Sequence, residues 1–303
     1  MALLRVRLIW NTIFAGLFIF SLTCFLLSII NYFVPKHINA EKPESARYDE
    51  YYPDLMRLNT IEKMEAYCDS IYMANASTMS YPEVVSAVVR KRFYHGYSYY
   101  NKFTNPMASF FSLGVGKGAT AIVLPEDIIK FPFGACSQQS IVGMELVKRK
   151  GYNVRKVTMY DDITKQGHFT YEANYDNSWH FFDTDMEPDA KVLGQYNRPS
   201  VAYLKQHPEV TALAYHGKNP LLFERLVSSA IVGPSNEQTA PVATKFQRAT
   251  KFLNYFSWVF GAIFILIRRR ILVRKSKAFT WFKRKSTQFQ PINATMQGRE
   301  ARA

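Results

Sequence analysis

An uncharged apolar run near the amino terminus constrains the structure of this chain most strongly. Residues 8–34 contain no charged side chain. A helix rises about 1.5 Å per residue, so a run of this length can cross a hydrocarbon layer of about 30 Å. A cleaved signal peptide has a shorter apolar core, of about 7–15 residues, followed by a small-residue cleavage site. The run therefore predicts an uncleaved transmembrane helix over residues 8–34.

A second apolar run covers residues 252–267, and residues 271–273 extend it beyond three consecutive arginines. Arginine side chains at the end of a span can reach the lipid headgroups, so the arginines do not exclude a membrane helix. We expect a second transmembrane helix over residues 252–273. A buried or interfacial helix is the alternative interpretation.

The net charge of +14 is concentrated beside these two runs. Residues 37–250 carry 23 Lys+Arg against 23 Asp+Glu, so this part of the chain is neutral and no basic surface for nucleic acid is indicated. The positive-inside rule places residues 1–7 and a basic tail, residues 274–303, in the cytoplasm. The domain between the spans is then extracytoplasmic. The basic tail is expected either to lie on anionic lipid headgroups or to be solvated.

Between the spans we expect a linker over residues 35–58 and an α+β domain over residues 59–245. Residues 94–120 are rich in Gly, Tyr, Asn and Phe and predict a long loop. The periodicity of apolar residues predicts the regular elements. These are helices at 61–74, 82–93, 136–150, 201–206 and 221–228, and strands at 154–159, 167–175 and 178–184.

Cys136 lies at the start of the helix predicted over residues 136–150. The partial positive charge at a helix amino terminus favours the thiolate, which is the nucleophilic form of cysteine. Three cysteines do not form a disulfide framework. We expect Cys68 to be a buried structural thiol, with a bond between Cys68 and Cys136 in an oxidising compartment as the alternative.

A histidine and two aspartates lie on or after the last two predicted strands, which an Asp-Asn turn joins as a hairpin. In the resulting register His168 is diagonal to Asp183 on the same face of the sheet and opposite Asp185. The spacing permits a hydrogen bond between His168 and Asp183, with Asp185 as a rival partner.

Four motifs occur in a characteristic order: Gly-x-Cys at 134–136, Gly-Tyr-x-x-Arg-x-Val at 151–157, Gly-His-x-x-x-Glu at 167–172 and Trp-x-x-x-Asp at 179–183. Over residues 80–188 the chain resembles the transglutaminase-like superfamily of cysteine enzymes. The resemblance implies a papain-like α+β core, in which a helix bearing the cysteine packs on a small antiparallel sheet bearing the histidine and the aspartate. It also implies Cys136 as nucleophile, His168 as general base and acid, and Asp183 as the residue that orients the imidazole.

One feature departs from the family pattern. Animal transglutaminases use a tryptophan upstream of the cysteine at the oxyanion, and this chain has no tryptophan between Trp10 and Trp179. The candidate oxyanion donors are the backbone N–H at Cys136 and the side-chain amides of Gln138 and Gln139, because only a well-aimed donor is needed.

Neither a cofactor nor a metal is expected. His180 with Asp183 and Asp185 is the set considered as metal ligands, but adjacent strand positions point to opposite faces of a sheet. His180 therefore faces away from both aspartates, and no second His or Cys completes a site.

These features predict a membrane-anchored, extracytoplasmic thiol enzyme of the hydrolase or acyltransferase class. It would cleave or transfer an amide or ester acyl group through a Cys thioester, as a protease, an amidase or a transglutaminase does. We expect a two-pass protein of a bacterial inner membrane, with a protein, peptide or glycan-linked substrate in the envelope and envelope proteins as partners. One alternative is a catalytically inactive module that binds or scaffolds in an envelope or surface-polysaccharide assembly. Another is an enzyme with inverted topology and a cytoplasmic domain.

Overall fold

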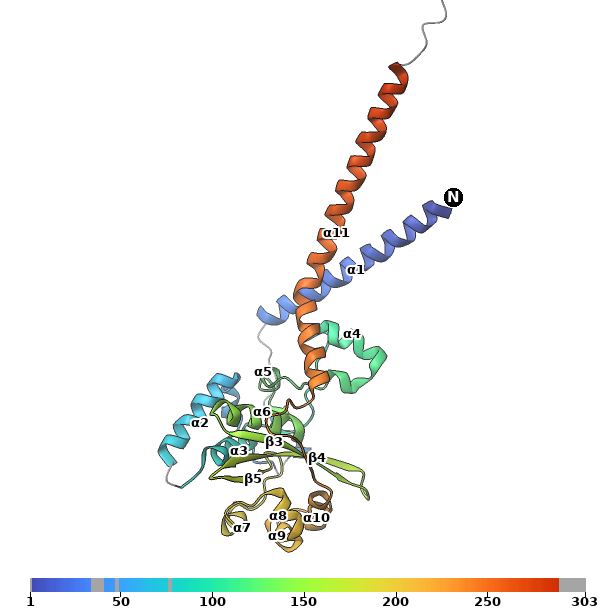
Figure 1. Ribbon diagram of the computed structural model, residues 1–303. Coiled ribbons are helices and arrows are strands. Elements are labelled where there is room, and N and C mark those ends of the chain that lie inside the picture. Colours follow the sequence, from blue (N-terminus) through green and yellow to red (C-terminus); the bar gives the residue numbers. More distant parts are fainter. Residues whose placement is uncertain (1, 34–40, 47–48, 76–77, 289–303) are drawn as a thin grey trace, which may run out of the picture. The chain divides into compact units, whose positions relative to one another are not determined.

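The computed structural model describes residues 2–33, 41–46, 49–75 and 78–288 (Figure 1). The chain divides into two compact units, residues 1–27 with 252–303, and residues 28–251. Parts of the predicted amino-terminal segment, linker and basic tail, at residues 1, 34–40, 47–48 and 289–303, lie outside the described residues.

The first unit is formed by parts of two long helices, α1 (Ala2–Phe33) and α11 (Pro241–Gln288). Ile9–Phe33 and Pro241–Ile271 are long and apolar enough to cross a membrane. Within the unit the two helices touch, because the rings of Phe14 and Phe264 stack with centroids 4.3 Å apart. The second predicted span is therefore part of a longer helix that begins at Pro241.

The second unit combines helices with a small antiparallel sheet of strand order β5-β4-β3-β6. The strands are β3 (Asn153–Asp161), β4 (Gln166–Tyr175), β5 (Ser178–Phe182) and β6 (Ile231–Val232). The three predicted strands are confirmed, and Tyr175 pairs with Ser178. Asp176 and Asn177 have φ values of 48° and 58°, which a tight hairpin turn requires and which Asp and Asn tolerate.

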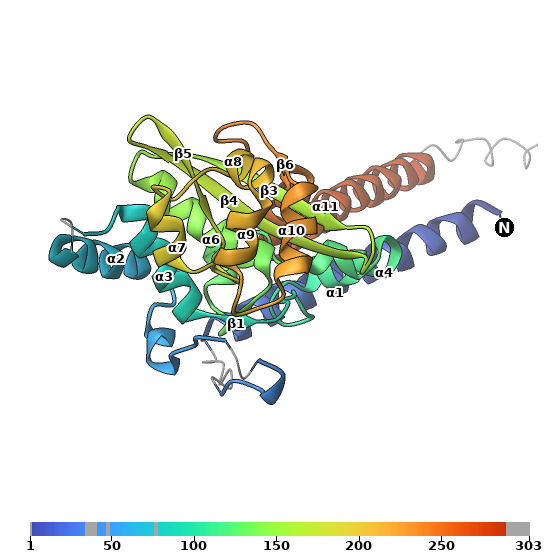
Figure 2. The ribbon, with the colours of Figure 1, turned by 90° about the horizontal axis from the view of Figure 1, so that it is seen from below.

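Helices cover both faces of this sheet (Figures 1 and 2). One face packs against α2 (Ile61–Asn75), α3 (Tyr81–Arg92) and α6 (Cys136–Arg149). The other packs against α7 (Ala190–Gln195), α8 (Val201–Gln206), α9 (Pro208–Ala214) and α10 (Pro220–Ser228). The five predicted helices are confirmed, whereas α7 and α9 are additional.

The two faces of the sheet have separate apolar cores. Tyr171 and Phe182 belong to the core under α2, α3 and α6. Val157, Met159 and Phe181 belong to the core under α7 to α10. Residues that alternate along a strand point to opposite faces, so both helical layers hold the sheet in place.

Close contact between α6 and β4 depends on Gly143. A Cβ atom at Gly143 would lie only 3.0 Å from Cε1 of Tyr171, so a larger residue would press on the Tyr171 ring, which would have to shift by a few tenths of an ångström. One turn earlier, Oγ of Ser140 donates a hydrogen bond to the carbonyl of Phe169 at 3.1 Å. These contacts bring the first residue of α6 beside the beginning of β4.

The loop prediction for residues 94–120 is wrong in part. The segment contains β1 (Tyr94–His95), α4 (Pro106–Val115) and a 3-10 helix, η3 (Lys117–Thr120). The short strand β1 pairs in parallel with β2 (Phe133–Gly134), immediately before α6. This pairing places residues near 95 beside the start of the cysteine-bearing helix.

The remaining short elements are α5 (Pro125–Ile128) and two 3-10 helices, η1 (Glu44–Ala46) and η2 (Pro53–Arg57). Leu55, inside the predicted linker, is buried in the core under α2, α3 and α6. The carboxyl-terminal part of that linker is therefore packed against the domain.

The first turns of α11 belong to the second unit. Gln247, which is fully buried, accepts a hydrogen bond from the backbone N–H of Val123 at 3.0 Å and donates one to the carbonyl of Ala121 at 2.7 Å. Lys251 forms an ion pair with Asp127 at 2.7 Å. The helix is thus fastened to residues 121–127 before its long apolar stretch begins.

Candidate active site

A cleft of about 1230 Å³ opens where α6 and β4 begin. Sγ of Cys136, a ring nitrogen of His168 and a carboxylate oxygen of Asp185 lie within 4.8 Å of one another at this cleft. His95, Tyr97 and Lys218 contribute to its wall. Residues from β1, α6, β4 and the segment after β5 therefore converge on one concave surface.

Cys136 is the first residue of α6, and its exposed fraction is 9%. The thiol thus faces the cleft at a helix amino terminus, where the helix dipole stabilises a negative charge. Cys68 and Cys136 form no disulfide with each other. Burial raises the pKa of the fully buried Cys68 to about 12, which leaves that thiol protonated and unreactive.

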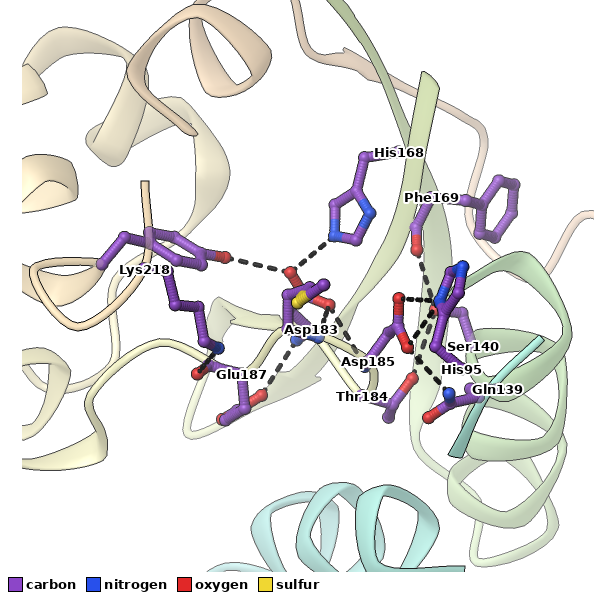
Figure 3. A network of polar contacts seen from close by, with 12 residues as sticks. His95, Gln139, Ser140, His168, Phe169, Asp183, Thr184, Asp185, Glu187 and Lys218 are labelled. Carbon is purple, nitrogen blue, oxygen red and sulfur yellow. Dashed lines mark hydrogen bonds and ion pairs between the residues drawn. The ribbon is translucent and has the colours of Figure 1, made fainter. Parts of the chain in front are cut away.

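His168, near the start of β4, is hydrogen-bonded to Asp183, which follows β5 directly (Figure 3). Nε2 of the imidazole lies 2.6 Å from Oδ2 of the carboxylate. An ionised carboxylate only accepts hydrogen bonds, so Nε2 carries the proton and Nδ1 is left for the thiol. A hydrogen bond to Cys136 and the charge of Asp183 both favour a protonated imidazole.

Asp183 is fully buried and accepts several hydrogen bonds besides that of His168 (Figure 3). The donors are the backbone N–H groups of Asp185 and Met186, at 3.2 and 2.9 Å, and the hydroxyl of Tyr215, at 3.1 Å. Burial alone would raise the pKa of Asp183, but the charge and hydrogen bond of His168 hold it below 3.8. The carboxylate is thus fixed and charged.

Burial also opposes the charge on His168, but the charge of Asp183 and the two hydrogen bonds outweigh it. The pKa of His168 is raised well above 6.5 as a result. An imidazolium that persists at neutral pH beside a thiol stabilises the thiolate form of that thiol.

Asp185, the rival partner, is hydrogen-bonded elsewhere. Its carboxylate lies 2.9 Å from Nδ1 of His95 and accepts a hydrogen bond from Nε2 of Gln139 at 2.8 Å (Figure 3). The hydrogen bond to Asp185 raises the pKa of His95 above 6.5. Asp183 therefore contacts the imidazole of His168 directly, and Asp185 belongs to a second pair on the wall of the cleft.

The two candidate glutamines have structural partners. Nε2 of Gln138 donates to the carbonyls of Ser98 and Ile122, at 2.9 and 2.8 Å, while Oε1 accepts from the backbone N–H groups of Ser98 and Ala135. Nε2 of Gln139 donates to the carbonyl of Gly134 and to Asp185. Both amide nitrogens are thus already occupied, which leaves the backbone N–H groups of the first turn of α6 as the remaining candidates for an oxyanion site.

His180 lies away from this group. Nδ1 of its buried ring lies 2.8 Å from the carbonyl of Arg198, and Nε2 lies 3.1 Å from the carbonyl of Tyr175. Among the residues that the structure describes, Cys136, His168 and Asp185 form a group whose sulfur, nitrogen and oxygen atoms could hold a metal ion such as zinc.

No pattern in the sequence predicts a role at the site for His95, Tyr97, Tyr215 or Lys218. His95 and Tyr97 follow the helix α3 in a segment that shows no periodicity, and the two-residue pairing of β1 with β2 is too short to produce a pattern. Tyr215 and Lys218 lie on the connection between α9 and α10. The clustering of Tyr and His in residues 94–100 was the available signal for the first two.

Comparisons of the chain with models of known protein families, with curated proteins and with solved structures find no significant match.

Proposed function

We propose that residues 59–245 form an extracytoplasmic thiol enzyme with a papain-like, transglutaminase-like core. The observation that carries the proposal is the His168 to Asp183 hydrogen bond of 2.6 Å beside a free thiol that faces an open cleft. A nucleophile, a base within reach of it and a third group that orients the base form the common arrangement of covalent acyl-transfer enzymes.

In the proposed reaction the thiolate of Cys136 attacks the carbonyl carbon of an amide or ester, and a C–S bond forms. The imidazolium of His168 gives its proton to the departing amine or alcohol as the C–N or C–O bond breaks. Water or an amine then attacks the thioester and passes a proton to His168. The thiolate leaves with the C–S electron pair, which restores the starting state.

The developing oxyanion requires donors that no glutamine amide supplies in this arrangement. We assign this role to the backbone N–H groups at the start of α6, including that of Cys136. Such groups have no partner within their own helix and point along its positive dipole.

An activity-based probe for reactive thiols tests the proposal. The wild-type protein should be labelled, while Cys136→Ala and His168→Ala should each lose labelling, because one variant lacks the nucleophile and the other lacks its base. Circular dichroism of each variant checks that the fold is retained. Equal labelling of all three folded proteins would exclude the mechanism.

A second candidate function is that of a catalytically inactive module which binds or scaffolds in an envelope or surface-polysaccharide assembly. The observation that favours it is the full occupation of the Gln138 and Gln139 amide nitrogens. In that case the cleft would still bind a protein, peptide or glycan-linked ligand, but Cys136 would react no faster with the probe than an ordinary thiol does.

We further propose that both termini lie in the cytoplasm of a bacterial cell and that the domain acts in the envelope. The arginine-rich flanks of the two apolar helices support this orientation. Alkaline phosphatase fused after residue 200 should be active, because that enzyme matures only when exported. An inactive but stably expressed fusion would instead indicate the inverted topology and a cytoplasmic domain.

A further inference from the structure

The helix α4 presents large apolar side chains outward. Phe111 and Leu113 on the helix are 45% and 84% exposed, and Phe103, just before it, is 47% exposed. Single exposed apolar residues are common on soluble proteins, whereas a group of them on one short element marks a surface that binds something apolar.

The helix is a well-formed element rather than a frayed end. Pro106 occupies its first turn, and the side chain of Asn105 caps it by accepting a hydrogen bond from the backbone N–H of Ala108 at 3.1 Å. Asn105 and Ala108 are both fully buried. The beginning of α4 is thus anchored in the domain, and Phe111 and Leu113 are exposed on its second half.

A hydrogen bond from the cap of α4 to α11 indicates what covers the exposed apolar side chains of α4. Nδ2 of Asn105 donates a hydrogen bond to Oγ1 of Thr250 at 3.0 Å, and both residues are buried. Thr250 lies two positions before Phe252, where the apolar run of α11 begins. Figure 1 shows α4 beside the first turns of α11. The cap of α4 is thus fastened to the turn from which the chain enters its second apolar span.

We propose that α4 lies in the interfacial layer of the lipid bilayer, with Phe111 and Leu113 inserted between lipids. Exposed aromatic and aliphatic side chains gain free energy when they leave water for the boundary between headgroups and acyl chains. Lys102, whose ammonium group lies 5.2 Å from the ring centre of Phe103, adds a cation that can meet lipid phosphate. The occupant is the bilayer itself, so this inference does not depend on the chemistry at Cys136.

Photocrosslinking in a bilayer tests the proposal with the full chain. Benzoylphenylalanine is introduced at Phe111 or Leu113, the protein is placed in nanodiscs of phosphatidylethanolamine and phosphatidylglycerol, and lipid adducts are counted by mass spectrometry after irradiation. Leu26, half exposed on α1, is the control for a lipid-facing position. Leu221, 66% exposed on α10, is the control for a position facing water.

We expect the yield of lipid adducts at positions 111 and 113 to approach that at position 26 and to exceed that at position 221 severalfold. Yields equal to that at position 221, or adducts formed with protein instead of lipid, would overturn the proposal. Substitutions at these exposed positions leave the buried cap at Asn105 intact, so loss of folding is not expected at either one.

Discussion

Between about pH 6 and about pH 7, Cys136 should react with iodoacetamide at least about tenfold faster in the wild type than in a His168→Gln variant. The raised pKa of His168 keeps an imidazolium beside the thiol across this range. Glutamine carries no charge and cannot take up the proton of the thiol, so the variant lacks the group that favours the nucleophilic form of Cys136.

The other two cysteines give the control for this measurement. Cys68 and Cys24 are buried and should contribute little, so a Cys136→Ala variant defines the background rate. The experiment is read by mass spectrometry of the alkylated peptides, which separates the three sites. Equal rates in the wild type and in His168→Gln would contradict the assignment of His168 as the partner of Cys136.

An Asp183→Ala substitution should lower the free energy of unfolding by about 3–5 kcal/mol. The change removes a buried carboxylate and leaves the imidazole of His168, the hydroxyl of Tyr215 and the backbone N–H of Met186 without their acceptor. Denaturant unfolding of the detergent-solubilised protein, followed by tryptophan fluorescence, measures the loss.

The matched control is Asp185→Ala. Asp185 is also nearly buried, but its partner His95 is half exposed and can hydrogen-bond to water instead. We expect a smaller loss, of about 1–2 kcal/mol. Equal losses in the two variants would contradict the claim that the buried partners of Asp183 make its loss more costly than the loss of Asp185.

The pair formed by His168 and Asp183 also makes the stability of the protein depend on pH. Burial alone would raise the pKa of Asp183, but His168 holds that pKa below 3.8. The contribution of Asp183 to the free energy of unfolding is therefore complete above pH 3.8 and is lost as the pH falls through the lowered pKa. The pKa of His168 is raised, so its contribution is complete below 6.5 and is lost as the pH rises through the raised pKa. Stability from the pair is thus greatest between 3.8 and 6.5, and Asp183→Ala should flatten the profile.

Local patterns in the sequence predicted the elements that hold the catalytic candidates. The Asp176-Asn177 turn fixes the hairpin register through to the pairing of Tyr171 with Phe182, because each strand position has only one partner. The helix that starts at Cys136 was predicted from its apolar stripe and its stop at Gly151, and it ends at Arg149. These signals are local, so a single sequence reveals them.

The remaining features depend on contacts between distant segments. His95 reaches Asp185 across 90 positions through a strand of two residues, and no periodicity reports such a pairing. The helix α4 lies among Gly, Asn and Tyr residues that favour loops, so the sequence pattern predicts a loop where the structure has a helix. The roles of Gln138 and Gln139 required coordinates, because their partners lie in separate parts of the chain.

Two buried glutamines, Gln247 and Gln138, form hydrogen bonds with the backbone of residues 121–123. Gln247 of α11 hydrogen-bonds to the backbone of Ala121 and Val123. Gln138 of α6 donates a hydrogen bond to the carbonyl of Ile122, which lies between them. Gln138 also accepts the backbone N–H of Ala135, which adjoins Cys136. The backbone of residues 121–123 is thus hydrogen-bonded both to the first turns of α11 and to the first turn of α6, so a single short segment joins the beginnings of these two helices.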